Sequence, residues 1–261
     1  MLTVLIDSFD GYSDLWPAFF AVFERHWPMC PYPVRLVSNH KTFDGVETIT
    51  VGDETTWSAR TLAAVTSLDT EYVLLLLEDY LLGRTVDTAD VEELLSYARE
   101  HDARYLRLSD IPKSRYHRGE KYYPLYTDEE YGVNLQASLW RRDYLIECLE
   151  RYSGSAWDFE IGLLRETVGA PHERMVGCYG MSTDPLAIHN GVLKGKWFPR
   201  EIRYFSRLGI AIDWQARGRL STPQLLKYRL SVGLKNILSY RARKRLKALL
   251  RKCGVKFASD L

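Results

Sequence analysis

Two adjacent acids follow the most apolar segment of the chain. Glu78 and Asp79 come directly after residues 72–77, a run of one tyrosine, one valine and four leucines. An apolar run without alternation is typical of a central parallel strand that is buried on both faces. Ligands bind outside the carboxyl ends of such strands, and paired carboxylates supply the oxygen ligands that Mg²⁺ and Mn²⁺ prefer. The sequence therefore predicts a divalent-cation site at Glu78 and Asp79; the alternative is that both acids simply end the strand in solvent.

Two further acids lie at the start of a helix that we expect to begin near Ser155, namely Asp158 and Glu160. A carboxylate at a helix N-terminus stays ionised and can accept a proton from a hydroxyl group. Ser155 and Asp158 also have the spacing of a capping box, with Asp in place of Glu, which is a purely structural alternative. Because residues two apart point in different directions on a helix, only one acid is expected to face a cleft. Asp158 is the predicted general base and Glu160 the alternative.

A late histidine is the third candidate. His189 is followed by Asn190 and Gly191, and then by the cations Lys194 and Lys196. Imidazole is a common metal ligand, and nearby cations can neutralise a leaving phosphate. The alternative is a histidine satisfied within the fold.

Three well-known motifs are absent from the sequence: G-x-G-x-x-G after the first predicted strand, G-x-x-x-x-G-K-[ST], and G-x-S-x-G. Their absence removes the main support for a dinucleotide-binding Rossmann domain, for a P-loop protein and for a serine hydrolase of the nucleophile-elbow type.

The elements that must position these residues alternate between strands and helices, which predicts an α/β sheet. We expect strands over residues 2–6, 34–37, 47–51, 72–77, 105–108 and 132–139, and helices over residues 57–68, 90–99 and 143–151, after the polar turn 7–14 and after Ser155. Residues 111–130 are polar, aromatic and basic, and are predicted to form a long surface loop.

Charge is distributed unevenly along the 261 residues. The formal net charge is +1, but residues 217–256 hold 13 of the 35 Lys and Arg residues and no Asp or Glu. The rest of the chain therefore holds 22 basic against 34 acidic residues. An acidic body with a basic tail suggests an anionic partner for the tail. We expect a catalytic domain over residues 1–215 and a basic amphipathic helical tail over residues 216–261.

The apolar stripe of the tail is predicted to lie at a membrane interface or to pack on the acidic body. Its leading members are Leu225, Leu226, Leu230, Leu234, Ile237 and Leu238. A helix of this kind can place its basic side on anionic headgroups. The tail carries few aromatic residues for base stacking, so no nucleic-acid partner is expected.

The four cysteines are scattered without a C-x-x-C motif, which favours a reducing compartment. The N-terminus lacks the basic region of a signal peptide. We therefore expect a cytoplasmic protein, either free or peripheral on the inner face of the membrane.

Taken together, four segments resemble GT-A type nucleotide-sugar glycosyltransferases of bacterial surface-polysaccharide synthesis. They are E-Y-V-L-L-L-L-E-D-Y at residues 71–80, G-V-N-L-Q-A-S-L-W-R-R-D at 132–143, W-D-F-E at 157–160 and H-N-G at 189–191. The resemblance covers roughly residues 1–200 and rests on the order and spacing of motifs that are weak singly. It implies a GT-A, Rossmann-like mixed sheet flanked by helices.

The resemblance also implies roles for individual residues. Leu77-Glu78-Asp79-Tyr80 occupies the place of the family's D-x-D motif, so Asp79, supported by Glu78, is expected to bind Mn²⁺ or Mg²⁺, and His189 to complete the metal site. Asp158, or Glu160, matches the acid that activates the acceptor. The donor-binding set then comprises Asp7, Ser8, Phe9, Ser38, Asn39, Arg60, Lys194 and Lys196. The implied partners are a nucleotide-sugar donor and a glycan or lipid-linked acceptor.

Two other functions remain open from the sequence. A sugar nucleotidyltransferase also uses an α/β sheet with an acid-bound Mg²⁺, but it usually carries a Gly-rich basic loop after its first strand. Residues 7–14 here contain three Asp and no Lys or Arg. A non-catalytic scaffold of a polysaccharide-assembly complex is the other alternative, because E-D-Y departs from D-x-D.

Overall fold

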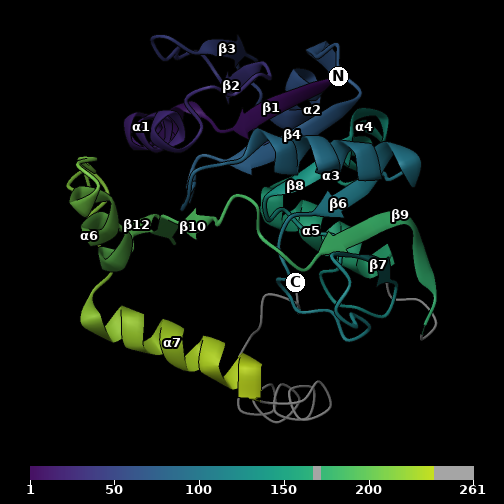
Figure 1. Cartoon of the computed structure of the whole chain (residues 1–261). Helices are drawn as coiled ribbons and strands as arrows, with labels where there is room; N and C mark the ends of the chain where they lie inside the picture. Colours follow the sequence, from purple (N-terminus) through teal and green to yellow (C-terminus); the bar gives the residue numbers. More distant parts are fainter. Residues whose placement is uncertain (167–171, 238–261) are drawn as a thin grey trace.

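One mixed sheet runs through the molecule, as the computed structural model shows for residues 1–166 and 172–237 (Figure 1). Its strand order is β3-β2-β1-β4-β8-β6-β9-β7. The strands are β1 (Leu2–Asp7), β2 (Val34–Ser38), β3 (Glu47–Thr50), β4 (Tyr72–Leu77), β6 (Tyr105–Arg107), β7 (Tyr122–Tyr126), β8 (Ser138–Arg141) and β9 (Arg174–Met181). The strands β3, β2, β1 and β4 are parallel, whereas β8 is antiparallel to both β4 and β6.

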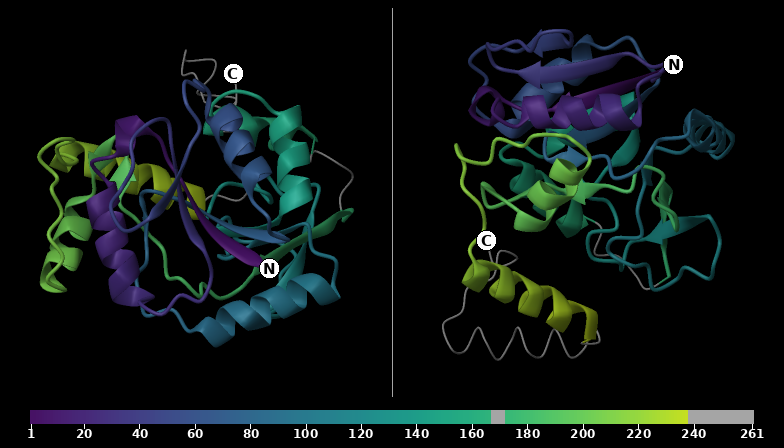
Figure 2. Two further views of the ribbon diagram at one scale, coloured as in Figure 1. Left: turned by 90° about the horizontal axis from the view of Figure 1, so that it is seen from above. Right: turned by 60° about the vertical axis from the view of Figure 1, so that its left-hand side comes forward.

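Helices cover both faces of this sheet. The side chains of β1 alternate between two cores: Val4 and Ile6 pack with α1 (Trp16–His26) and α3 (Thr88–Glu100), while Leu5 packs with α2 (Trp57–Ser67), α4 (Arg142–Arg151) and α5 (Ala156–Glu166). The view from above shows α1 and α3 on one side of the sheet and α2 on the other (Figure 2). Because both faces are covered, β4 can be continuously apolar, and its first five residues are buried.

The remaining elements lie near the carboxyl end of β4. The two-residue strands β5 (Tyr80–Leu81) and β10 (His189–Asn190) pair antiparallel, and β11 (Val192–Leu193) and β12 (Lys196–Trp197) form a hairpin. A short 3₁₀ helix, η1 (Asp10–Tyr12), follows β1, and α6 (Pro199–Arg207) follows the hairpin. These pieces bring the last third of the chain back to the ends of β1 and β4.

The predicted Rossmann-like mixed α/β sheet flanked by helices is confirmed. Three local expectations were wrong. The strand predicted over residues 132–139 begins only at Ser138, the predicted loop 111–130 contains β7, and β4 has a parallel neighbour on one side only because β8 runs antiparallel. Strand β9 (Arg174–Met181) was not anticipated, since Gly177 and Gly180 interrupt its apolar pattern.

The C-terminal part contains the predicted helix as far as the structure describes it. Helix α7 (Thr222–Ile237) leads away from the sheet (Figure 1), and Leu226 and Tyr228 on it are 58% and 38% exposed. The predicted continuation of the stripe at Leu238 and the basic residues beyond it lie outside the described residues. Within the described ranges, no helix is long and apolar enough to cross a membrane. The division at residues 215 and 216 stays a prediction.

Candidate active site

Two carboxyl groups meet where the parallel strands β1 and β4 end. Asp7 is the last residue of β1 and pairs in register with Leu77, so Glu78 follows directly beside it. The Thr61 hydroxyl donates a 2.9 Å hydrogen bond to Oδ2 of Asp7, while Asp7 Oδ1 is buried and has no partner among the described residues. The Ser8 hydroxyl, which accepts a 2.8 Å hydrogen bond from the Trp16 indole, bonds to Glu78.

Burial dominates the electrostatics of this edge. It raises the pKa of Asp7 to about 7, against the opposing effects of Thr61 and of the positive charge of Arg60. It raises the pKa of Glu78 well above its usual value, and the neighbouring charge of Asp79 adds to that. The pKa of Asp79 rises to about 6 for the same reason of desolvation. Carboxyl groups held in this way favour the binding of a cation, which would restore their ionised forms.

Asp79 is attached to the hairpin β11–β12. Its carbonyl oxygen accepts a 2.8 Å hydrogen bond from the Gly191 amide, and its carboxylate accepts one from the amide of Val192. A Cβ at Gly191 would lie 2.9 Å from the Trp197 ring and 3.3 Å from the Asp79 carbonyl oxygen, so this close approach requires glycine. Lys194 and Lys196 are exposed on the hairpin that begins here.

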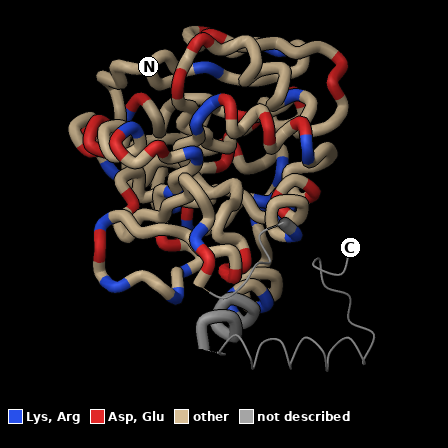
Figure 3. The backbone as a smooth tube through the Cα atoms, turned by 90° about the vertical axis from the view of Figure 1, so that its right-hand side faces the viewer, with Lys and Arg blue, Asp and Glu red and all other residues tan. Residues whose placement is uncertain are grey.

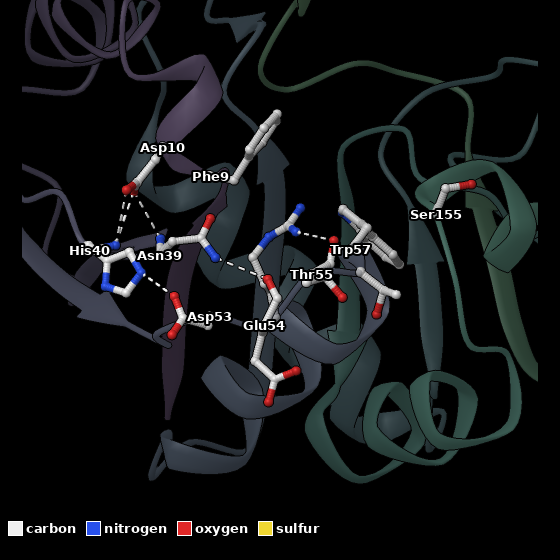
Figure 4. Close-up of a pocket in the computed structure, with 11 residues that line it drawn as sticks. Phe9, Asp10, Asn39, His40, Asp53, Glu54, Thr55, Trp57 and Ser155 are labelled. Carbon is white, nitrogen blue, oxygen red and sulfur yellow. Dashed lines mark hydrogen bonds and ion pairs between the residues drawn. The ribbon is translucent and has the colours of Figure 1, made fainter.

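An open pocket of about 750 Å³ lies beside this edge, at the ends of β1 and β2 and the start of α2 (Figure 4). Of the predicted donor-binding residues, Phe9, Asn39 and Arg60 line it, together with Asp10 and Trp57. The buried residues Asp7, Ser8 and Ser38 lie at the ends of the same strands, whereas Lys194 and Lys196 do not line the pocket.

Hydrogen bonds fix the loops around this pocket. The Asn39 side-chain amide donates to the carbonyl oxygens of Gly52 and Glu54 at 2.8 and 3.0 Å. The Asp10 carboxylate accepts three backbone hydrogen bonds, each of 3.1 Å, from residues 39, 40 and 41. These bonds explain why the pKa of Asp10 is lowered although burial opposes the shift. The Arg60 guanidinium lies 5.0 Å from the centroid of the Phe9 ring, and its Nε is buried without a partner among the described residues.

Glu160 faces the interior beside this group of acids. Its Oε1 accepts a 2.8 Å hydrogen bond from the Leu135 amide, and burial raises its pKa. Burial also raises the pKa of the Tyr80 phenol, and the charges of Asp79 and Glu160 raise it further. The side-chain amide of Gln136 donates a 3.3 Å hydrogen bond to the Tyr80 hydroxyl. A carboxylate whose pKa is raised by burial accepts a proton more readily than a solvated one.

Asp158 points elsewhere and caps its own helix. Its Oδ2 accepts hydrogen bonds from the Ser155 amide at 2.8 Å and from the Ser155 hydroxyl at 2.6 Å, and its own amide donates to the Ser155 hydroxyl at 3.2 Å. This is the reciprocal arrangement of a capping box. Asp158 is exposed, and the hydrogen bonds from Ser155 lower its pKa. Of the two candidate bases, the structure therefore brings Glu160, and not Asp158, to the acids at the end of β4.

His189 lies on the neighbouring strand but is engaged by other groups. Its Nδ1 is 2.5 Å from Oε2 of the buried Glu201, and its ring stacks on Tyr204 with 4.7 Å between centroids. Its Nε2 packs against Gly83, where a Cβ would lie only 2.7 Å away. The predicted set of Glu78, Asp79 and His189 is thus not brought together as three ligands.

Few side chains are therefore available as ligands for a metal ion. Across residues 1–166 and 172–237, no group of three or more His, Cys, Asp or Glu side chains is arranged to hold a metal ion. Glu78 and Asp79 nevertheless fit a cation that takes its other ligands from a substrate, because Mg²⁺ is usually bound by one or two carboxylates plus phosphate oxygens. A metal at this place stays a prediction.

Sequence reasoning missed two residues of this site, Tyr80 and Gln136, and it missed the ion pair of Arg217 with Asp14 in the turn after β1. The first two lie within the segments that carried the family resemblance, but nothing in their spacing shows that they meet. Arg217 lies 203 residues from its partner Asp14. Its only sequence signal was its place at the start of the basic tail.

Comparisons with known proteins give similarities of fold. No family model matches the chain, and no curated protein sequence matches it. Among solved structures, CMP:2-keto-3-deoxy-manno-octonic acid synthetase complexed with CTP is 14% identical over 80% of this chain and 98% of that chain, with a TM-score of 0.49. The galactosyltransferase LgtC, in complex with donor and acceptor sugar analogs, is 14% identical over 80% and 95%, with a TM-score of 0.41.

S. aureus TarS 1–349 is 10% identical over 69% of this chain, with a TM-score of 0.40, and the chain spans 60% of its length. The TM-scores of these three structures are below 0.5. The function proposed below therefore rests on the geometry of this chain.

Replacement of Asp158 by Ala is expected to lower the thermal unfolding midpoint. The reason is that the substitution removes the acceptor for two Ser155 donors at the start of α5. Because the pKa of Asp158 is lowered from 3.8 on folding, its stabilising effect is fully present above about pH 3.8 and is lost as the pH falls through the lower folded value. The measurement is a melting curve at pH 7 and at several acidic pH values. The exposed Glu150→Ala is the control, and an equal effect in both variants would argue against the cap.

Proposed function

We propose that the protein is a glycosyltransferase that moves a sugar from a nucleotide-diphosphate donor to a glycan or lipid-linked acceptor in cell-surface polysaccharide synthesis. One observation carries this proposal: the buried acids Asp7 and Glu78 and the partly buried Asp79 stand together at the ends of β1 and β4, beside the pocket at the ends of β1 and β2. Hydrogen bonds connect these parts: Thr61, next to the pocket residue Arg60, donates to Asp7. The adjacent residues Leu135 and Gln136 donate to Glu160 and to the Tyr80 hydroxyl, respectively.

The pocket is the proposed site of the nucleoside. It offers the aromatic ring of Trp57, the ordered loop of Asn39 and the partly unpaired guanidinium of Arg60. An aromatic wall with a few fixed polar groups is the usual character of a small-molecule site. The diphosphate would then extend toward Glu78 and Asp79, and the sugar toward Tyr80 and Glu160.

Glu160 is the proposed base in this geometry. The acceptor hydroxyl attacks the anomeric carbon, the bond from that carbon to the diphosphate oxygen breaks, and the hydroxyl proton passes to the Glu160 carboxylate. The Leu135 amide holds Oε1 of Glu160 and leaves the other oxygen for the proton. A Mg²⁺ or Mn²⁺ bound at Glu78 and Asp79 would stabilise the negative charge of the departing diphosphate.

Replacement of Glu160 by Gln is expected to lower the turnover number by roughly 10²-fold or more, the usual scale for loss of a general base. The assay measures nucleotide release from a panel of nucleotide sugars, each with and without acceptor. The capping variant Asp158→Ala is the matched control from the same helix and should retain turnover. Loss of turnover in Asp158→Ala with full activity in Glu160→Gln would reverse the assignment. Pyrophosphate release from a nucleoside triphosphate and a sugar phosphate would instead identify a nucleotidyltransferase.

Replacement of Asp79 by Asn is expected to lower turnover strongly and to weaken its dependence on Mn²⁺ or Mg²⁺, since a charged cation ligand is lost. Turnover is titrated against each metal ion after chelation, with the fold checked by circular dichroism. Asp44→Asn, at an exposed acid outside the pocket, is the control. If the metal titration is unchanged in Asp79→Asn, then Glu78 and Asp79 do not bind the metal ion and only end strand β4.

The C-terminal tail is proposed to bind an anionic membrane surface, which would bring the enzyme to a lipid-linked acceptor. Lys227 and Arg229 lie on α7 beside the exposed Leu226 and Tyr228, while acidic and basic residues are interspersed over the body (Figure 3). The ring of Tyr228 also contacts that of Phe198, at 5.3 Å between centroids, which is the competing contact with the body. Each Lys or Arg near an anionic surface contributes about 1 kcal/mol, screened by salt.

Co-sedimentation with phosphatidylserine-containing vesicles tests this proposal. The full chain is expected to bind at low salt and to be released by added salt, and a chain that ends at Leu220 should stay in the supernatant. Phosphatidylcholine vesicles are the control. If the full chain also stays in the supernatant at low salt, the tail does not bind anionic membranes.

A further inference from the structure

The segment that follows α6 returns to the candidate site. The Trp197 amide donates a 3.1 Å hydrogen bond to the Gly218 carbonyl, and the Leu220 amide donates a 2.9 Å hydrogen bond to the Trp197 carbonyl. Residues 218–220 are thereby joined to strand β12, which ends the hairpin that begins beside Asp79. The first basic residue of the tail, Arg217, is held at this point.

Arg217 is fixed against the turn that follows β1. Its Nε and Nη2 donate to the two oxygens of Asp14, each at 2.6 Å, and Nη2 also donates to the Gly11 carbonyl at 2.8 Å. The guanidinium carbon lies 3.9 Å from the centroid of the Tyr12 ring. The Arg217 side chain is only 12% exposed. A planar guanidinium held on two edges and one face has a defined orientation.

One edge of the guanidinium remains available. Nη1 of Arg217 carries two hydrogens and has no hydrogen-bond partner among the described residues. The backbone next to Arg217 is bonded to the hairpin that holds Asp79: the Gly218 carbonyl accepts from the Trp197 amide, and the Gly191 amide donates to the Asp79 carbonyl oxygen. Arg217 therefore stands at the hairpin that begins beside the acid that ends β4. A fixed cation with a free donor edge therefore stands beside the predicted diphosphate site.

We propose that Arg217 is a donor-binding residue whose Nη1 hydrogen-bonds to the diphosphate of the nucleotide sugar. This role rests on the proposed function. When the bond from the anomeric carbon to the diphosphate oxygen breaks, its electron pair stays on the diphosphate, and Arg217, which remains protonated throughout, stabilises the added charge. Asp14 and Tyr12 keep the guanidinium in place before the donor arrives, so little conformational entropy is lost on binding.

Arg217 also gives the basic tail a second role. Its backbone leads within five residues into α7, so the membrane-facing helix and the diphosphate site belong to one continuous segment. The exposed Lys194 and Lys196 on the hairpin lack such anchoring among the described residues. Arg217 is therefore the better-positioned of the three cations.

Binding of a nucleoside diphosphate, compared with binding of its nucleoside, tests the proposal without turnover. Calorimetry on the full chain with UDP, CDP, GDP, ADP and dTDP first selects the tightest ligand, which is then compared with its nucleoside. Arg217→Gln is expected to lower the affinity for the diphosphate roughly 10- to 100-fold, because a hydrogen bond to a charged group contributes about 1.5–3 kcal/mol. The affinity for the nucleoside should change less than about 2-fold, since the nucleoside lacks the groups that Arg217 contacts. Arg217→Lys should retain part of the diphosphate affinity.

Two further variants separate binding from anchoring. Arg219→Gln, two residues along the same segment with its guanidinium 5.2 Å from the Trp214 ring, should leave both affinities unchanged. Asp14→Asn removes the carboxylate that holds Arg217 but keeps the Arg217 cation. It should therefore lower the affinity for the diphosphate less than Arg217→Gln does. Equal loss for nucleoside and diphosphate in Arg217→Gln, or no loss for either, would overturn the proposal while leaving the proposed function standing. If Arg217→Gln does not fold, an unweakened diphosphate affinity in Arg217→Lys and Asp14→Asn would overturn it equally. A wild-type chain that binds no nucleoside diphosphate would contradict both.

Discussion

Burial of carboxyl groups at the ends of two adjacent parallel strands is the constraint on which the site depends. Asp7 and Glu78 are buried, and Asp79 is partly buried, with Asp7 Oδ1 unpartnered among the described residues. Desolvation raises the pKa of all three. Burial of ionised carboxyl groups costs stability unless a partner compensates their charge. It is therefore expected where a cationic partner or a substrate group is to be bound.

The cations near this edge are placed by elements far apart in the chain. Arg60 comes from α2, and Arg217 comes from the start of the C-terminal segment. Burial is the larger effect and raises the pKa of Asp7 and of Asp79, whereas the charges of Arg60 and Arg217, respectively, oppose that rise. Each is held on an aromatic ring, Phe9 for Arg60 and Tyr12 for Arg217, and both rings belong to the turn after β1. That turn has no Lys or Arg of its own, so its positive charge comes from distant segments of the chain that the tertiary structure brings to it.

The fold also turns two acids of one helical turn in different directions. Asp158 and Glu160 are only two residues apart, yet one caps the helix in solvent and the other is turned toward Tyr80 and the Leu135 amide. The difference follows from the 100° rotation per residue of an α-helix, which separates side chains two apart by more than half a turn. The Gly154 carbonyl, bonded to the Ser58 amide of α2, fixes the start of α5 and thereby its rotation.

The sequence by itself determined the α/β alternation, the limits of β4 and the two acids at its end, because hydrophobic runs and polar turns act over a few residues. It also marked the capping box at Ser155 and Asp158. The meeting of Phe9, Asn39 and Arg60 in one pocket, the antiparallel insertion of β8, the engagement of His189 by Glu201 and the return of Arg217 to Asp14 were decided only by the tertiary structure. Each of these depends on contacts between distant segments, whose register and side-chain direction no local pattern specifies.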